Sequence, residues 1–245
     1  MKLNTREWGS GERIALLVHG IMSDSRSWRR VGPALAERGY RVVAVDLRGH
    51  GASARAESYL REQYAADVVE TAEALGGVDV AIGHSLGGLA LLLAVEELKP
   101  GRAVYADPAW RLSRPEEGFD PTSFVRFADE ATLESIALVA PRWDPEDVAI
   151  EVETLAVWDR QSALDLSKNA AAALEGGTAG DGTGLPLAPV VPSLVLLADN
   201  STLIQAADAE KLRERGFTLR TVPGAGHTIH RDDFAGFMAG LEGWI

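Results

Sequence analysis

The chain has 245 residues, of which 46% are hydrophobic and 24% are charged, a composition ordinary for a globular protein with a substantial core. Its formal net charge of −12 argues against nucleic acid and anionic membrane surfaces as partners, because both are polyanions. It has no cysteine, which excludes disulfides, a thiolate nucleophile and a zinc site built from cysteines.

The N-terminal residues 1–20 contain no uninterrupted apolar segment followed by a small-residue cleavage site, so no signal peptide is predicted. The most apolar stretch, LGGLALLLAVEEL at residues 86–98, is too short to span a bilayer. We therefore expect a cytoplasmic protein with no membrane or nucleic-acid partner. The sequence leaves the oligomeric state open.

Short apolar runs alternate with longer helical patterns along the chain. The runs are nearly continuous in apolar residues, which is typical of strands buried on both faces of a parallel sheet. They occupy residues 13–20, 40–47, 78–85, 102–108, 193–200 and 218–224. Helical patterns fill residues 24–39, 85–101 and 232–245. This alternation predicts an α/β fold with a mostly parallel, open sheet flanked by helices.

One interval, residues 109–188, breaks the alternation. It contains helical patterns at residues 123–139 and 145–176 but no convincing strand, and a glycine-rich segment follows at residues 176–192. A structureless loop of that length is uncommon inside a compact domain. We therefore predict a helical cap over residues 109–188 that ends in a glycine-rich connector. Residues 1–108 and 189–245 then form the core.

Polar residues follow the predicted strands at the points where those strands end. Ser85, Asp107, Asp199 and His227 all occupy such positions, and the carboxyl ends of parallel strands meet at one edge of a sheet. A serine needs a base within hydrogen-bond reach, and the base needs an acid that orients it. The segment GHSLG at residues 83–87 fits the G-x-S-x-G elbow, in which a serine stands exposed between a strand and a helix. The amide of Leu86, in the first turn of that helix, is a candidate oxyanion donor.

Four segments together resemble the α/β-hydrolase fold superfamily over nearly the whole chain. They are VHGIMSDSRSW at residues 18–28, VDLRGHGAS at 45–53, GHSLGG at 83–88 and GAGHTIHRDDF at 224–234. The resemblance implies that the first segment is an oxyanion loop with the Ile21 amide as second donor. It also implies that the last segment bears the catalytic histidine.

Five histidines compete for the role of base. Only His227 lies in the expected loop after a strand. We expect His19 and His50 to tie loops together, and the side chain of His84 to project away from Ser85. His230 begins the last helical segment and is expected to cap or line it.

The acid has two candidates. Asp199 ends a predicted strand and gives the order serine–acid–histidine that the family shows, so we predict Asp199. Asp107 ends the strand that a minority of the family uses, and it is the alternative. Asp46 is interpreted as a turn-forming carboxylate.

The predicted site contains no metal and no cofactor. No cluster of histidine and acidic residues has metal-ligand spacing, and the glycine-rich segments lack the phosphate-loop and dinucleotide patterns. Four tryptophans are candidates for an apolar substrate pocket under the cap, although a single tryptophan more often serves ordinary packing. They are Trp28, Trp110, Trp143 and Trp158.

These observations predict a serine hydrolase that cleaves a small or medium, largely apolar carboxylic ester or a lactone through an acyl-enzyme on Ser85. The same residues are compatible with carbon–carbon bond hydrolysis, perhydrolysis or acyl transfer. A ligand-binding or receptor-like member of the same fold, with little turnover, is the alternative from another class.

Overall fold

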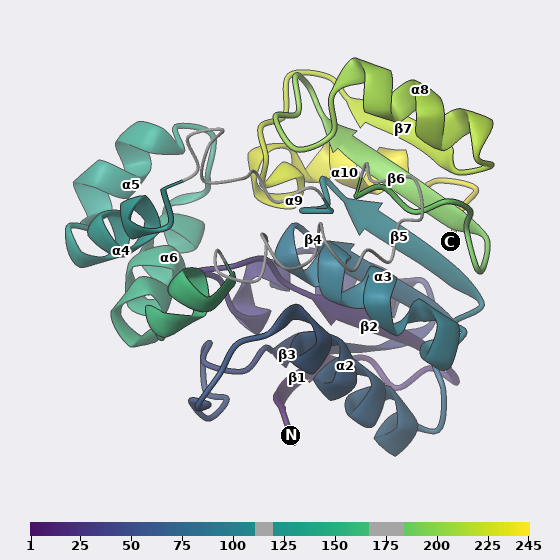
Figure 1. Ribbon diagram of the computed structural model, residues 1–245, viewed down its shortest axis with the longest axis horizontal. Coiled ribbons are helices and arrows are strands. Elements are labelled where there is room, and N and C mark those ends of the chain that lie inside the picture. The colour runs from purple at the N-terminus through teal and green to yellow at the C-terminus, as the bar shows by residue number, and fades with distance from the viewer. Residues whose placement is uncertain (111–119, 167–183) are drawn as a thin grey trace.

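The computed structural model describes residues 1–110, 120–166 and 184–245. The strands form a seven-stranded sheet in the order β1-β3-β2-β4-β5-β6-β7, in which only β1 runs antiparallel to its neighbour (Figure 1). All six predicted strands are present, as β2 (Arg13–Val18), β3 (Tyr40–Asp46), β4 (Val80–His84), β5 (Arg102–Ala106), β6 (Ser193–Ala198) and β7 (Thr218–Val222). The predicted α/β fold is therefore confirmed.

The edge strand β1 (Asn4–Trp8) was not predicted from the sequence. Its segment NTREW has four exposed residues and pairs with β3 along one side only. The other strands were predicted from continuous runs of apolar residues, and this polar edge strand contains no such run.

Side chains of the central strands alternate between two apolar layers, one on each face of the sheet. In β2, Leu16 and Val18 belong to one layer and Ala15 and Leu17 to the other, as the period of two in a strand requires. The first layer packs against α2 (Arg61–Leu75), α3 (Leu86–Leu98) and α8 (Ala206–Glu214). The second packs against α1 (Val31–Glu37), the 3-10 turn η1 (Ser25–Trp28) and α10 (Phe234–Gly240).

Among the described residues between β5 and β6, helices α4 (Thr122–Asp129), α5 (Leu133–Val139) and α6 (Pro145–Val157) form a group beside the sheet (Figure 1). The pattern at residues 123–139 was read as one helix but forms two, because Thr132 caps a new helix by accepting a hydrogen bond from the Ser135 amide. These helices share a small apolar cluster of their own, centred on the fully buried Trp158.

This group matches the predicted helical cap in position, and we call it the cap. Part of the predicted glycine-rich connector, residues 176–183, lies outside the described residues. The domain boundaries at residues 108 and 189 stay predictions.

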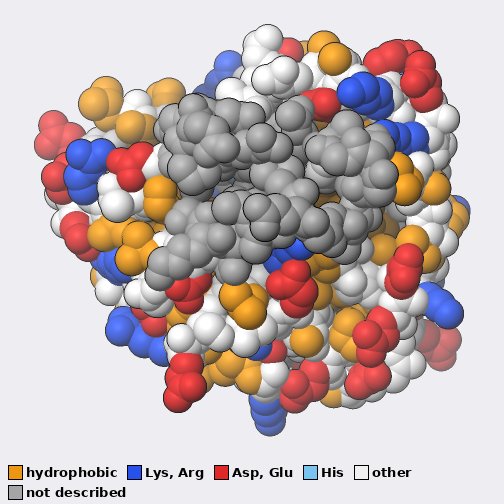
Figure 2. Space-filling model, in the orientation of Figure 1, with side chains coloured by type: hydrophobic (Ala, Val, Ile, Leu, Met, Phe, Trp, Pro, Cys, Tyr) orange, Lys and Arg blue, Asp and Glu red, His pale blue; other side chains and the backbone are white. Residues whose placement is uncertain are grey.

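Acidic and basic side chains are interspersed on the face of the molecule seen in Figure 2. Among the described residues, no helix is both long and apolar enough to cross a membrane.

Candidate active site

The loops after β2 and β4 meet at the carboxyl edge of the sheet. These strands are neighbours in the sheet although β3 lies between them in the sequence, so the chain leaves them in opposite directions and opens a crevice there. A Cβ atom added to Gly20 would lie 3.1 Å from the Cβ of Ser85. The loop that continues into Ile21 therefore passes directly beside Ser85.

Ser85 occupies a strained turn between β4 and α3. Its backbone angles are φ 50° and ψ −114°, a conformation that non-glycine residues rarely adopt and that is concentrated at functional sites. The flanking glycines permit this turn: a Cβ on Gly83 would lie 2.4 Å from the carbonyl oxygen of Gly87, and one on Gly87 would lie 2.3 Å from that of Val18. Only glycine fits at these two contacts.

His227 pairs with Asp107. The distance from His227 Nδ1 to Asp107 Oδ2 is 2.7 Å. Because a carboxylate accepts, Nδ1 carries the donated proton, which leaves Nε2 of a neutral imidazole as a proton acceptor. The Asp107 side chain is 2% exposed and that of His227 is 45% exposed, so the imidazole is anchored on its buried side and open on the other.

The structure does not bring Asp199 to His227, in contrast to the prediction. Asp199 is exposed, and its Oδ2 accepts a hydrogen bond of 2.8 Å from the Gly224 amide. Asp107 follows β5, the direct neighbour of β4, whereas Asp199 follows β6, one strand further from Ser85. The backbone of Asp107 has a positive φ of 41°. Its side chain is buried at the ends of the strands, where Oδ1 lies 3.4 Å from the Ala198 amide.

Two of the other histidines tie loops together, as expected. His19 Nδ1 donates to the Gly20 carbonyl and its Nε2 accepts from the Leu47 amide, while His50 Nδ1 donates to the Arg48 carbonyl. Burial lowers the pKa of both rings, so they stay neutral in these roles. Asp46 accepts from the amides of Ser25 and Ala52, in agreement with its predicted turn-forming role.

The remaining two histidines lie close to His227. His84 Nε2 donates to the His227 carbonyl oxygen at 2.9 Å, so the residue before Ser85 fixes the backbone of the histidine loop. His230 does not cap its helix: it is buried in α9 (Ile229–Asp232) and stacks on Trp28 with ring centroids 4.2 Å apart. Burial lowers the pKa of both rings well below the ordinary value.

A cavity of about 360 Å³ connects Ser85 and His227 with the cap. Ile21 and Leu86, the predicted oxyanion donors, line it as well. The remaining lining residues are Met22, Ser23, His84, Ala109, Phe124, Trp143, Glu151, Ala163, Leu166, Thr202, Leu203, Thr228 and Arg231. The exposed surface of this lining is mainly apolar, which suits a substrate with a substantial hydrocarbon part.

Of the four tryptophans proposed for the pocket, Trp143 is the one that lines this cavity. The other three belong to cores. Trp28 is fully buried against His230, Trp110 packs on Tyr105 and donates to the Gly88 carbonyl, and Trp158 is fully buried within the cap. Their burial follows from the large apolar area of the indole, which gains more from packing than from facing a solvent-filled cleft.

A buried ion pair in the cavity wall was not predicted from the sequence. Arg231 Nη1 lies 2.5 Å from Glu151 Oε2, and both side chains are at most 10% exposed. Burial raises the pKa of Glu151, an effect that the charge of Arg231 opposes. The two residues are 80 positions apart in the sequence, so no local pattern predicts their contact.

The described residues contain no group of three or more histidine and acidic side chains that could hold a metal ion.

Comparison with known proteins bears on this geometry. The model of the alpha/beta hydrolase family matches residues 15–239. The chain belongs to this family. A non-heme chloroperoxidase of Burkholderia pyrrocinia is 29% identical over 93% of this chain and 91% of its own length. A non-heme haloperoxidase of Rhodococcus erythropolis is 42% identical over 34% of this chain and 31% of its own length, so that similarity spans about a third of either protein.

Solved structures of this family share the fold at low sequence identity. An N-formylmaleamic acid deformylase from Pseudomonas putida S16 superposes with a TM-score of 0.75 at 24% identity, covering 97% of this chain and 94% of that one. The enol-lactonase from Burkholderia xenovorans LB400 superposes with a TM-score of 0.71 at 22% identity, covering 98% and 94%. At these identities the likeness supports the alpha/beta hydrolase fold and nothing finer.

Proposed function

We propose that this member of the alpha/beta hydrolase family is a serine hydrolase that cleaves small or medium, largely apolar carboxylic esters or lactones. The observation that carries the proposal is the 2.7 Å hydrogen bond between Asp107 and His227 Nδ1, in a loop that lines the same cavity as the strained Ser85. A serine, an imidazole and a carboxylate are the parts of a nucleophilic triad, in which the imidazole takes the serine proton and the carboxylate orients the imidazole.

In the proposed reaction, Ser85 Oγ attacks the substrate carbonyl while His227 Nε2 takes the hydroxyl proton. Asp107 keeps the other ring nitrogen protonated and stabilises the imidazolium that forms. The Ile21 and Leu86 amides stabilise the oxyanion, and the loss of one such donor typically costs about 3 kcal/mol of transition-state stabilisation. His227 then protonates the leaving alkoxide and activates a water that hydrolyses the acyl-enzyme. Every group in this scheme belongs to the protein or is water, so the scheme needs no cofactor.

The size and lining of the cavity support the substrate class. A volume of about 360 Å³ lies near the lower end of the range for small-molecule sites. The exposed lining surface is mainly apolar, although about half of the lining residues are polar, among them Ser85, His227 and the paired Arg231 and Glu151. Such a lining favours a short acyl chain or a compact ring over a large polar substrate.

The experiment is hydrolysis of p-nitrophenyl acetate and butyrate by the purified protein and by Ser85→Ala. We expect release of p-nitrophenol by the unmodified protein and a decrease of about 10³-fold or more in the variant, because the covalent route is then lost. Activity that survives in Ser85→Ala would overturn the proposal. A panel of lactones, measured with the same pair of proteins, defines the substrate class.

A second candidate is perhydrolysis, in which hydrogen peroxide replaces water in the attack on the acyl-enzyme. The similarity to two relatives named as non-heme peroxidases favours it. With acetate, hydrogen peroxide and bromide, the peracetic acid formed at Ser85 would oxidise bromide to hypobromous acid and return acetate, so bromination of monochlorodimedone that is lost in Ser85→Ala would support this activity.

A further inference from the structure

The loop that carries His227 is held from the core side by three hydrogen bonds. Asp107 accepts from the His227 ring, His84 donates to the His227 carbonyl, and Asp199 accepts from the Gly224 amide. These contacts fix the middle and the start of residues 224–232, which we call the histidine loop.

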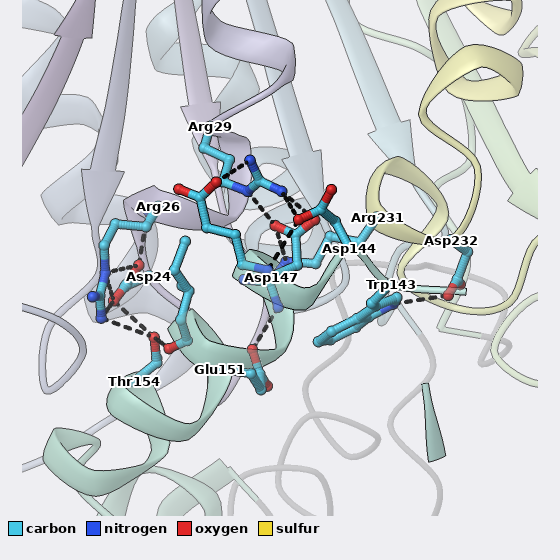
Figure 3. Close-up of polar contacts among 12 residues, drawn as sticks. Asp24, Arg26, Arg29, Trp143, Asp144, Asp147, Glu151, Thr154, Arg231 and Asp232 are labelled. Atoms are coloured by element: carbon cyan, nitrogen blue, oxygen red, sulfur yellow. Dashed lines mark hydrogen bonds and ion pairs between the residues drawn. The ribbon is translucent and has the colours of Figure 1, made fainter. Parts of the chain in front are cut away.

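The cap holds the same loop from the opposite side, at both flanks of His227. Before His227, the Arg142 guanidinium donates to the Gly224 carbonyl. After it, Trp143 Nε1 donates to Asp232 Oδ1 at 2.9 Å, and the Trp143 ring covers the Arg231 guanidinium, whose Cζ lies 4.5 Å from the ring centroid (Figure 3).

Helix α6 continues this attachment through buried charges. Glu151 pairs with Arg231 at 2.5 Å, and Asp147 lies 3.9 Å from Arg231 Nε. Asp147 is in turn bound by Arg29, which follows η1 in the core, at 2.8 and 3.2 Å (Figure 3). Arg231 and Asp147 are at most 2% exposed, so solvent screens these contacts little.

Trp143 contacts both the cavity and the histidine loop. Its side chain lines the cavity that Ser85 and His227 also line, and its indole N–H binds Asp232, five residues after His227. Asp232 itself does not appear among the described residues that line the cavity. A ligand in the cavity therefore contacts the residue that anchors the histidine loop, while the anchoring carboxylate stays outside it.

We propose that Trp143 and Asp232 are positioning residues, through which the cap sets the orientation of His227. The inference rests on the proposed function, because it assigns these residues to the alignment of the general base. Substrates that leave Trp143 against Asp232 keep His227 aligned, and substrates that displace the indole misalign it. Trp143 thereby links the choice of substrate to the rate of the chemical step.

The test is a double-mutant cycle on Trp143→Phe and Asp232→Ala, measured by covalent labelling of Ser85 with a fluorophosphonate. We expect each variant to lower the maximal labelling rate by about tenfold, and the double variant to be no slower than Asp232→Ala alone, because the contact between Trp143 and Asp232 is already lost in that variant. For Asp232→Ala the reagent concentration at half-maximal rate stays the same, since this residue lies outside the cavity lining.

Two control variants separate positioning from general damage. Asp232→Asn keeps an oxygen that accepts from the indole and is expected to label within about twofold of the unmodified protein. Trp158→Phe removes an indole N–H that has no hydrogen-bond partner among the described residues, so it should also label within about twofold while changing the packing of the cap.

A second readout does not depend on activity. The Nδ1 proton of His227, held by Asp107, is expected to give a downfield proton NMR resonance, identified by its loss in His227→Ala. Trp143→Phe and Asp232→Ala should shift or broaden it, and Trp158→Phe should not.

The outcomes separate the two proposals. The inference would be overturned if Ser85 is labelled efficiently and both variants leave the labelling rate and the NMR resonance unchanged. It would also be overturned if the double variant lowers the labelling rate by the product of the two single fold-decreases. A protein that resists labelling but shows the NMR shift would overturn the proposed function and support the positioning role.

Discussion

Asp107 and Asp199 differ in what surrounds each carboxylate. Asp107 is 1% exposed and directs Oδ2 at the imidazole, whereas Asp199 is exposed and holds the Gly224 amide. A buried carboxylate orients and stabilises an imidazolium better than an exposed one, because water screens its charge less. At the scale of single residues, the geometry therefore favours Asp107 as the acid of the proposed triad.

We predict that Asp107→Asn lowers the turnover of p-nitrophenyl butyrate by about 10³- to 10⁴-fold, because an amide no longer holds the imidazole in the tautomer that accepts from serine. Asp199→Asn should stay within about threefold of the unmodified protein, because its amide oxygen can still accept from Gly224. Steady-state kinetics of both variants, with folding checked by circular dichroism, make the comparison. A severe loss in Asp199→Asn together with an active Asp107→Asn would return the role to Asp199.

The sequence predicted much of this site because motif residues stand next to regular elements. Ser85 lies between a strand and a helix, and His227 follows a strand, as predicted, while their catalytic roles stay predictions. Asp107, the alternative acid, contacts His227 in place of the predicted Asp199, because strand order in the sheet, and not order along the chain, decides which carboxylate reaches the histidine. The Arg231–Glu151 pair was missed because it depends on how the cap packs.

Secondary-structure elements were predictable where one physical signal dominated. The central parallel strands are largely buried and read as apolar runs, with β6 fully buried along its length, whereas the edge strand β7 is only partly buried. Helix α3 was found because it is apolar nearly all round. Helix α2 was not predicted, since its residues mix charged and apolar types without a strong stripe.

The cap is an element whose attachment is largely polar. Arg26, within η1, binds Glu153 and Thr154 of α6. Arg29, which follows η1, binds Asp144 and Asp147 at the start of α6 (Figure 3). Charged contacts of this kind are directional, so they fix one orientation of the cap against the core more specifically than apolar packing alone. Patterns of periodicity along one element cannot predict which partner its charged face will meet.

For the whole molecule, buried histidines link stability to pH. His50 is fully buried and carries a pKa lowered to about 3, mainly by burial and further by the neighbouring His19. The unfolded chain binds a proton at this ring below a pKa of about 6.5, while the folded protein does not, so stability is complete above pH 6.5 and falls as the pH drops toward 3. At pH 5 this one group lowers the free energy of unfolding by about 2 kcal/mol.

We therefore predict that the free energy of unfolding falls by about 2 kcal/mol more in the unmodified protein than in His50→Asn when the pH is lowered from 7.5 to 5, because asparagine does not titrate. Urea unfolding at the two pH values measures the difference, whatever the variant loses at pH 7.5 through altered packing. An equal loss in both proteins would mean that His50 does not remain neutral when the chain folds.

The most direct measurement of the central claim is the position and rate of the adduct formed with a fluorophosphonate, located by peptide mass spectrometry. We predict a single adduct on Ser85 in the unmodified protein, and a rate at least about 100-fold lower in His227→Ala, because the hydroxyl then has no base. An adduct on another residue, or a rate that His227→Ala leaves unchanged, would contradict the account.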